Sequence, residues 1–372
     1  MSAIGDRRGV LSATGCDKVH QQHVYSQHLA TRAAEVALSV GALHQSAFME
    51  NSALLNTARR PLSPDAQIEI PASRSEYERV EEILEEEDAK YPRLQYDGVR
   101  KVAIVSAVPS PLHGEMVGQL LRKISRAVDG TPGLDENIKD RLSIATDMKN
   151  VEDVGDTSTT RNWDGALRYL TREESGSSHI LMIAVEVGFA QTYASLRAAI
   201  SFSACALRCR VGIAMCINEG ERAKRPSQKY YTTTEEKRAA IQDVEHVLRS
   251  QLQVNPFGPL TVGNDTWFGK VTTVVLETYR LQDETPPPDT ILSSTHSYTI
   301  VDDGGFVGGQ VPANLAEITL RDCIPTHILS GNNIEATPVN FFHQDWFEDS
   351  FSSAMLETAM VRVKEKYIVQ RV

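Results

Sequence analysis

Residues 180–187, with the sequence ILMIAVEV, form an almost continuous apolar run that is interrupted by a single glutamate, Glu186. A short run of this kind, rich in Ile and Val, is typical of a strand that is buried on both faces of a sheet. An ionised carboxylate at such a position is costly to remove from water unless it has a partner. The run therefore predicts a central strand and gives Glu186 either a structural or a functional role.

The segments on both sides of this run alternate between helical and extended patterns. Val102–Val108 is a β-branched run that ends before Pro109, and His113–Val128 repeats its apolar residues at helical spacing. The polar stretch 151–161 predicts a loop. Three further segments complete the region: a strand at 163–170 (WDGALRYL), a helix at 191–207 and a buried strand at 210–217 (RVGIAMCI). The alternation predicts a mixed α/β fold with a central mixed sheet flanked by helices.

Composition shifts along the chain suggest three parts. Residues 1–74 hold few large apolar residues apart from one helical pattern around 30–49, and predict a poorly ordered or loosely docked arm. Residues 75–285 form the α/β core domain and include two further helical patterns, at 76–90 and 235–253, and a strand at 267–280. The proline run 286–288 marks a linker, after which 286–372 predicts a strand-rich extension packed on the core, with a hairpin at 298–311 and a closing helix at 354–367.

Charge and hydropathy limit the partners of the chain. The formal net charge of −11 repels phosphate backbones, so binding of DNA or RNA requires a local patch or a bridging metal ion. No stretch reaches the apolar length of a membrane span, and the N-terminus lacks the apolar segment of a signal peptide. The expected location is therefore intracellular, in the cytoplasm or nucleus, with no membrane partner and with a protein partner left open.

Two readings of Glu186 remain open on the residues alone. An arginine or lysine could neutralise it in a structural ion pair, or a divalent metal ion could bind it. Asp164 lies in the neighbouring predicted strand, and adjacent strands are about 5 Å apart, so both carboxylates could reach one Mg²⁺ ion. Glu115, in the first turn of the predicted helix, could supply a third oxygen, and His113 could contact a phosphate or orient a water molecule.

The order of these elements resembles that of a known superfamily. A histidine-bearing helix, a strand with Trp163-Asp164-Gly165, a strand with Val185-Glu186-Val187-Gly188, a helix and a last strand are similar to the PD-(D/E)XK, restriction-endonuclease-like core, and most of all to uncharacterised fungal members. The resemblance covers residues 102–217 well and extends more loosely to about Pro325, whereas the first hundred residues lie outside it.

The resemblance implies an Mg²⁺-dependent hydrolase of phosphodiesters with DNA as the first substrate to test. Asp164 matches the first metal-binding acid, Glu186 the second, and Glu115 an occasional glutamate on the helix. The sequence departs from the motif at Gly188, where the superfamily carries a lysine that stabilises the attacking hydroxide and the developing charge. Some members place the basic or amide group on the following helix, where Gln191 or Arg197 could replace it.

Two other functions are weighed against hydrolysis of phosphodiesters. The first is a catalytically inactive nuclease-fold protein that acts as a binding or regulatory module, because such a protein would also lack the lysine. An acyl hydrolase has less support, because the sequence contains no G-x-S-x-G nucleophile elbow.

Overall fold

The computed structural model describes residues 52–87, 92–154, 157–173, 176–189, 193–205, 208–221, 228–281, 287, 290–308, 310–330, 334–366 and 368–370. The chain divides into two compact units, residues 1–57 and 58–372. The helical pattern predicted around 30–49 lies outside the described residues. The first unit contributes most of helix α2 (Ala53–Ala58), and every element named below belongs to the second unit.

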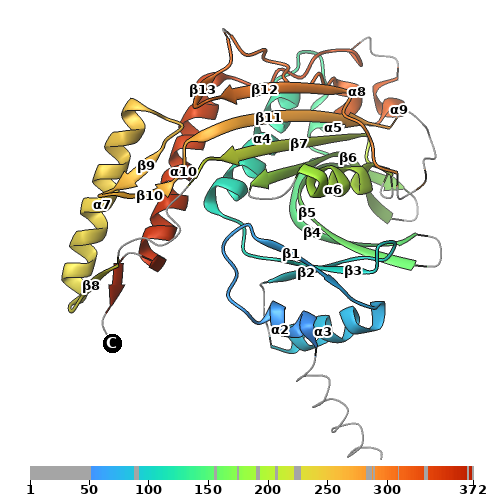
Figure 1. Ribbon diagram of the computed structural model, residues 1–372. Helices are drawn as coiled ribbons and strands as arrows, with labels where there is room; N and C mark the ends of the chain where they lie inside the picture. Colours follow the sequence, from blue (N-terminus) through green and yellow to red (C-terminus); the bar gives the residue numbers. More distant parts are fainter. Residues whose placement is uncertain are drawn as a thin grey trace, which may run out of the picture. The chain divides into compact units, whose positions relative to one another are not determined.

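A ten-stranded mixed sheet organises the second unit (Figure 1). Its strands follow the order β1-β3-β2-β5-β6-β7-β11-β12-β13, and β4 pairs with β5 beside this path. Within the sheet only β6 and β7 are described as a parallel pair, and the other pairings are antiparallel. The bounds are β1 Gln67–Pro71, β2 Arg93–Asp97, β3 Val102–Ser106, β4 Leu142–Val154, β5 Thr157–Glu173, β6 Gly176–Phe189, β7 Val211–Glu219, β11 Val271–Arg280, β12 His296–Asp302 and β13 Gly305–Phe306.

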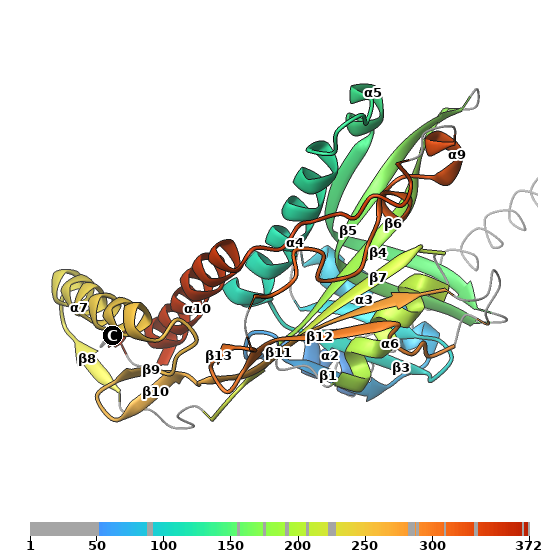
Figure 2. The same cartoon turned by 90° about the horizontal axis from the view of Figure 1, so that it is seen from above.

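Two helices cover opposite faces of the centre of this sheet. Helix α4 (Pro111–Asp129) packs on β4, β5 and β6, whereas α6 (Tyr193–Cys205) connects β6 to β7 and packs on β6, β7 and β11 (Figure 2). Since side chains alternate between the faces of a strand, neighbouring residues of β6 meet different helices. Val185 and Val187 join the core that contains α4, and Ala184 joins the core that contains α6. Because a helix covers each face of β6, residues on both faces are buried, which explains the continuous apolar run of this strand.

The remaining elements pack around this sheet or form two small sheets. Helix α10 (Gln344–Lys366) contacts α4 and α7 (Thr234–Val254). Strands β9 (Leu260–Val262) and β10 (Asp265–Phe268) form one two-stranded sheet, and β8 (Lys229–Tyr231) and β14 (Ile368–Gln370) form the other. The other helices are α3 Arg74–Glu86, α5 Glu136–Lys139, α8 Leu320–Cys323 and α9 Thr326–Leu329. Among the described residues, no helix combines the length and the apolar character that crossing a membrane requires.

The structure confirms a mixed α/β fold with a large mixed sheet flanked by helices, and it corrects three details. The predicted arm 1–74 contains β1, which pairs with β3 in the main sheet. Residues 151–154 and 157–161 of the predicted loop belong instead to the long strands β4 and β5, which pair antiparallel. The segment 286–372, expected to be strand-rich, has α10 as its longest element and contributes β12 and β13 to the main sheet.

Candidate functional site

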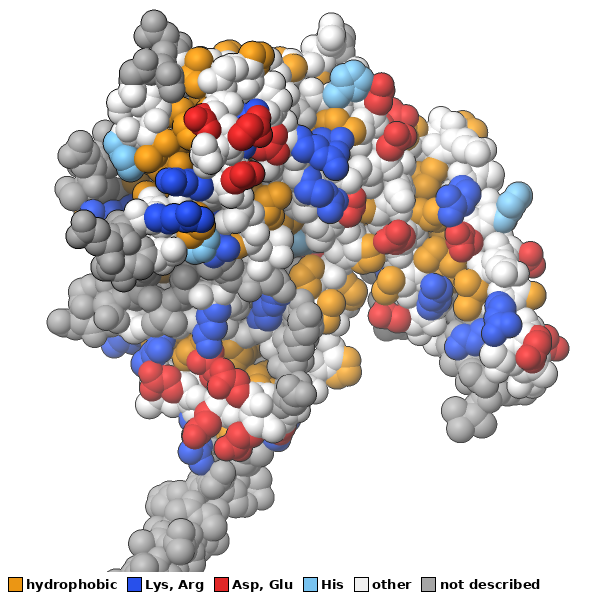
Figure 3. Space-filling model, turned by 180° about the vertical axis from the view of Figure 1, so that it is seen from behind, with side chains coloured by type: hydrophobic (Ala, Val, Ile, Leu, Met, Phe, Trp, Pro, Cys, Tyr) orange, Lys and Arg blue, Asp and Glu red, His pale blue; other side chains and the backbone are white. Residues whose placement is uncertain are grey.

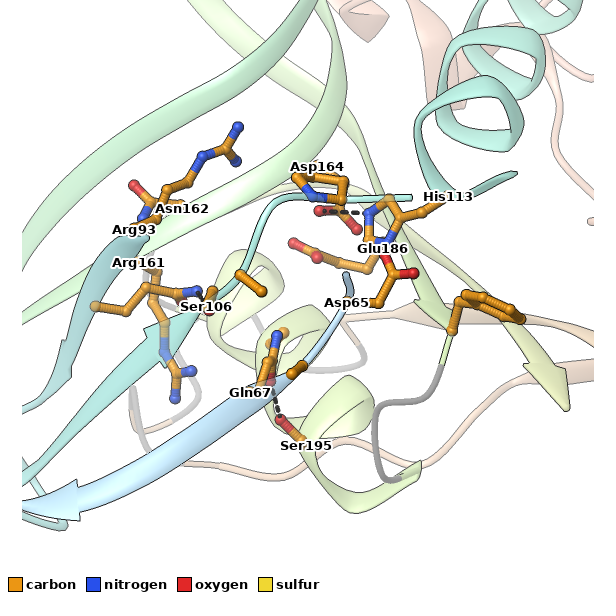
Figure 4. A pocket seen from close by; sticks show the side chains of 16 residues that line it. Asp65, Gln67, Arg93, Ser106, His113, Arg161, Asn162, Asp164, Glu186 and Ser195 are labelled. Atoms are coloured by element: carbon orange, nitrogen blue, oxygen red, sulfur yellow. Dashed lines mark hydrogen bonds and ion pairs between the residues drawn. The ribbon is translucent and has the colours of Figure 1, made fainter. Parts of the chain in front are cut away.

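Pairing of β5 with β6 brings the two predicted acids together. Gly165 is the cross-strand partner of Val185, so the next positions, Asp164 and Glu186, are neighbours on the opposite face. Both side chains line one pocket (Figure 4). Glu186 is only 6% exposed, which makes it one of the few buried carboxylates of the sheet.

A glycine beside Asp164 allows the close approach that shapes this region. A Cβ atom at Gly165 would lie 2.5 Å from Leu121 Cδ1 and 2.8 Å from Val117 Cγ1, both on α4. Helix α4 therefore packs directly on the backbone of β5. This contact places the N-terminal turn of α4, and His113 within it, next to Asp164.

Both carboxylate oxygens of Asp164 have partners. His113 Nε2 lies 3.0 Å from Oδ1, and the Val187 backbone N–H donates to Oδ2 at 2.9 Å. Burial by itself raises the pKa of Asp164, but the charge and hydrogen bond of His113 and the bond from Val187 outweigh it and lower the pKa. Asp164 is therefore held in its ionised form.

His113 bridges Asp164 to a third carboxylate, Asp65. Its Nδ1 lies 3.4 Å from Asp65 Oδ1, and the imidazole is 14% exposed. Burial by itself lowers the pKa of His113, but the charge of Asp164 and the hydrogen bonds to Asp164 and Asp65 raise the pKa to about 10. At neutral pH this side chain is a cation held between two carboxylates.

Asp65 is a site residue that the sequence does not reveal. It precedes β1 with a positive φ of 62°, which is uncommon for a residue other than glycine. Its Oδ1 accepts a hydrogen bond of 2.7 Å from the backbone N–H of Ser110, the N-cap residue of α4. The only local signal is the dipeptide Pro64-Asp65, which is also an ordinary turn sequence.

Glu186 has no neutralising partner in the described part of the chain. Its Oε1 is buried and has no hydrogen bond, and no ion pair joins it to a described lysine or arginine. Arg161 lies close enough to influence it but forms its ion pair with Asp97, at 3.2 Å. Burial, together with the charge of Asp164, raises the pKa of Glu186 well above its usual value. The structural ion pair that the sequence left open is therefore not found.

The pocket has a second wall, opposite the carboxylates, built from the N-terminal strands and from β5. Figure 4 shows side chains of β1, β2, β3 and β5 lining it together with Ser195 of α6. The polar residues of this wall are Gln67, Arg93, Gln95, Ser106, Arg161 and Asn162.

Two other residues named from the sequence, Glu115 and Arg197, do not line this pocket. Glu115 accepts hydrogen bonds from Gln119 Nε2 at 2.7 Å and from Arg122 at 3.3 Å along α4, and does not line the pocket. Gln191 lies outside the described residues. Arg197 donates to the backbone oxygen of Leu292 at 2.7 and 3.2 Å.

A side chain at Gly188, where the resemblance leads one to expect a lysine, would crowd Leu196 of α6. A Cβ atom there would lie 2.9 Å from Leu196 Cδ2, because α6 packs on this part of β6. The cations that line the pocket are instead His113, Arg93 and Arg161. They come from α4, β2 and β5.

The fit of a divalent metal ion rests on two oxygen donors. Within the described ranges, no group of three or more His, Cys, Asp or Glu side chains is arranged to hold a metal ion. Mg²⁺ commonly takes only one or two protein carboxylates and completes its shell with water and substrate phosphate oxygens. Ionised Asp164 and the unpaired oxygen of Glu186 satisfy that smaller requirement.

Comparisons with known proteins do not place this chain in a family. No family model matches the chain, and neither a curated protein nor a solved structure matches it.

Proposed function

We propose that this protein is a divalent-cation-dependent phosphodiester hydrolase whose catalytic core is of the restriction-endonuclease-like type. Support comes from the element order α4, β4, β5, β6, α6, β7, in which β4, β5 and β6 pair antiparallel and α6 leads to the parallel strand β7. Apart from β4, which the sequence does not predict, these elements follow the order on which the resemblance rests. The two matched acids occupy adjacent positions on β5 and β6.

The observation that carries the proposal is the unpaired oxygen of Glu186. Burying a carboxylate beside the ionised Asp164 without a counter-charge destabilises the fold. A chain retains such an arrangement most readily where a ligand supplies the missing positive charge. A divalent cation bound by Asp164 and Glu186 provides it.

The residues of the site would have separate roles in the reaction. Asp164 and Glu186 would hold Mg²⁺, which when bound supplies Lewis-acid activation of water and neutralises charge on the phosphate. Asp65 and Ser110 fix the first turn of α4, so that the His113 imidazolium faces the pocket. Both ring nitrogens of His113 are paired, with Asp164 and with Asp65, so its part would be to orient Asp164 and to contribute positive charge to the pocket.

A second candidate, a catalytically inactive binding module, is favoured by two specific observations. His113 already pairs with Asp164 at 3.0 Å, and position 188 carries a glycine that packs against Leu196 in place of a lysine. In this alternative the pocket binds an anionic partner without hydrolysing it. The two candidates differ in metal binding and turnover.

Hydrolysis of end-labelled DNA and RNA oligonucleotides in Mg²⁺ or Mn²⁺ tests the proposal, with EDTA as the blank. The parent should cleave, and Asp164→Asn and Glu186→Gln should each lower the rate by about 100-fold or more, as expected for removal of groups that stabilise transition-state charge. Glu115→Gln is the matched control and should cleave like the parent, because Glu115 pairs with Arg122 away from the pocket. Equal, metal-independent rates in all four proteins would exclude the assigned site.

A further inference from the structure

The first turn of α4 carries His113 and takes its position from hydrogen bonds to its backbone. Ser110 is the N-cap residue, and its Oγ accepts a hydrogen bond of 3.3 Å from the backbone N–H of His113. Asp65 Oδ1 accepts one of 2.7 Å from the backbone N–H of Ser110. Pro111, the first residue of the helix, has no N–H to satisfy. The N–H of this turn that still needs a partner is that of Leu112.

The partner of the Leu112 N–H comes from the C-terminal helix. Thr358 of α10 accepts this hydrogen bond through its Oγ1 at 3.0 Å and donates its own proton to the backbone oxygen of Ala354 at 2.8 Å. Figure 2 draws α10 beside α4, in keeping with the contact between the two helices. Thr358 therefore joins α10 to the turn that carries His113.

This hydrogen bond lies in the interior of the protein. The face drawn in Figure 3 carries Lys, Arg, Asp and Glu side chains interspersed with apolar ones. Thr358 and Leu112, in contrast, are only 2% and 0% exposed. A buried N–H group that loses its partner is costly, because water cannot replace the lost acceptor. Removal of the Thr358 hydroxyl should therefore displace or loosen the turn.

Helix α10 is itself held by Arg362, which lies four residues after Thr358 and so on the same face of the helix. Arg362 pairs with Glu219, the last residue of β7, at 2.7 and 3.1 Å, and donates to the backbone oxygen of Trp267 at 3.0 Å. Its guanidinium also lies 5.8 Å from the ring centroid of Phe189, the last residue of β6. The side chains of the ion pair are each 7% exposed. Helix α10 is thus fixed against the strand that carries the second acid of the site.

The position of the first turn of α4 matters because His113 contacts two carboxylates. Its Nε2 lies 3.0 Å from Asp164 Oδ1, and its Nδ1 lies 3.4 Å from Asp65 Oδ1. The longer of these distances is already near the outer limit of a hydrogen bond. Side chains that form a binding or catalytic site must be held to within about 0.5 Å of their working positions. A shift of that size in the turn would change how Asp164 is oriented.

From these observations we infer that Thr358 is a positioning residue of the proposed site. It acts through the backbone of Leu112 to set the position of His113, which in turn orients the carboxylate of Asp164. The inference rests on the proposed function, in which Asp164 is a ligand of the divalent cation. Its new content is that α10, from the C-terminal segment outside the predicted core domain, completes the alignment of the site.

Variants of Thr358 separate its hydroxyl from the volume of its side chain. Thr358→Val keeps the shape and removes the acceptor, whereas Thr358→Ser keeps the acceptor and removes a methyl group. Thr358→Ala, which also removes the acceptor, replaces Thr358→Val if that variant does not fold. Ser352→Ala is the matched control on α10, because Ser352 Oγ donates within its own helix, to the backbone oxygen of Asp349 at 3.3 Å. Circular dichroism and urea denaturation establish that each variant is folded and how stable it is.

The ring N–H signals of His113 give a readout that does not depend on catalysis. Two-dimensional NMR of protein labelled with ¹⁵N-histidine records them in EDTA at one fixed, near-neutral pH, and their loss in His113→Gln assigns them. Thr358→Val should shift or broaden these signals, because the imidazole moves relative to its two carboxylates. Thr358→Ser and Ser352→Ala should keep the signals of the parent.

Turnover of the oligonucleotide substrates in Mg²⁺ gives the second readout. Thr358→Val should lower kcat about tenfold and change KM less than about twofold, because misplacing a group at the reacting centre weakens the transition state more than substrate binding. Thr358→Ser should recover at least about half of the parent's kcat, and Ser352→Ala should match the parent.

Two outcomes overturn the inference. One is a folded Thr358→Val protein whose His113 signals and kcat equal those of the parent, because a lower unfolding midpoint alone would make Thr358 a purely structural residue. The other is a Thr358→Ser protein that is as impaired as Thr358→Val. Failure of the proposed hydrolase is seen separately, as absence of cleavage by the parent in Mg²⁺ and Mn²⁺ while the His113 signals still distinguish Thr358→Val from Thr358→Ser.

Discussion

At the scale of single residues, Glu186 is a buried acid that forms no ion pair with any lysine or arginine of the described residues. Asp164 is ionised and paired with His113, and its charge together with burial keeps the pKa of Glu186 well above the usual value. A group whose pKa is raised in the folded protein binds its proton more tightly there than in the unfolded chain. It therefore destabilises the fold increasingly as the pH rises above 4.5, the ordinary value for glutamate.

The first prediction follows from the raised pKa of Glu186. Glu186→Gln should raise the free energy of unfolding of the metal-free protein at pH 7.5 by about 1–3 kcal/mol, because an amide needs no counter-charge. Urea denaturation in EDTA measures it. Glu277→Gln is the matched control with the opposite sign, since Glu277 is a buried acid that accepts hydrogen bonds from Tyr193 and Tyr279. A Glu186→Gln protein less stable than the parent would contradict the assignment.

The second prediction concerns His113, whose pKa is raised from 6.5 to about 10. Because the folded protein holds this proton more tightly, the stabilisation is complete below pH 6.5 and is lost as the pH rises towards 10. In EDTA, the parent should lose stability over this range more steeply than His113→Gln. Unfolding midpoints measured at several pH values give the two slopes, and equal slopes would show that the histidine is not held as a cation.

Residues differ in how far the sequence reveals them. Glu186 and Asp164 are conspicuous because an acid within an apolar strand has few explanations. Asp65 and Arg161 are not, since one follows a proline in an apparent turn and the other lies in a polar stretch that predicts a loop. Their role depends on which strands become neighbours, and that pairing is decided by contacts between residues far apart in the chain.

At the scale of elements, α4 and the β5–β6 pair form the unit that positions the site. The helix contacts the backbone of β5 at Gly165, and its first turn is tied to Asp65 through Ser110. The apolar periodicity of the sequence predicts α4, β6, α6 and β7 well, because each buries a continuous apolar face. It misses the β4–β5 hairpin, because these long strands carry many polar residues and are held by backbone pairing.

The third prediction tests this packing. Gly165→Ala would place a Cβ atom 2.5 Å from Leu121 Cδ1, so it should lower the free energy of unfolding by about 1–3 kcal/mol and displace Asp164 from His113. Gly118→Ala, on α4 itself, is the control. Its Cβ atom would meet Arg122 no closer than 3.6 Å, and alanine is the better helix former by about 1 kcal/mol. Thermal unfolding of both variants gives the comparison, and equal stability would contradict the close approach.

At the scale of the whole molecule, one sheet links segments that the sequence assigns to different parts. Strand β1 belongs to the predicted arm and β12 to the predicted extension, yet both lie in the sheet that carries β5 and β6. The N-terminal strands also supply one wall of the pocket, so removing residues 52–74 would remove Asp65 and Gln67 from it. Composition alone could not show this, because β1 is a short and largely exposed edge strand.

Calorimetric titration of the purified protein with Mg²⁺ and Mn²⁺ tests the central claim most directly, beside an Asp164→Asn/Glu186→Gln double variant and the Glu115→Gln control. The account predicts that the parent and Glu115→Gln bind a divalent cation equally and that the folded double variant does not. Absence of binding by the parent, or equal binding by the folded double variant, would contradict it.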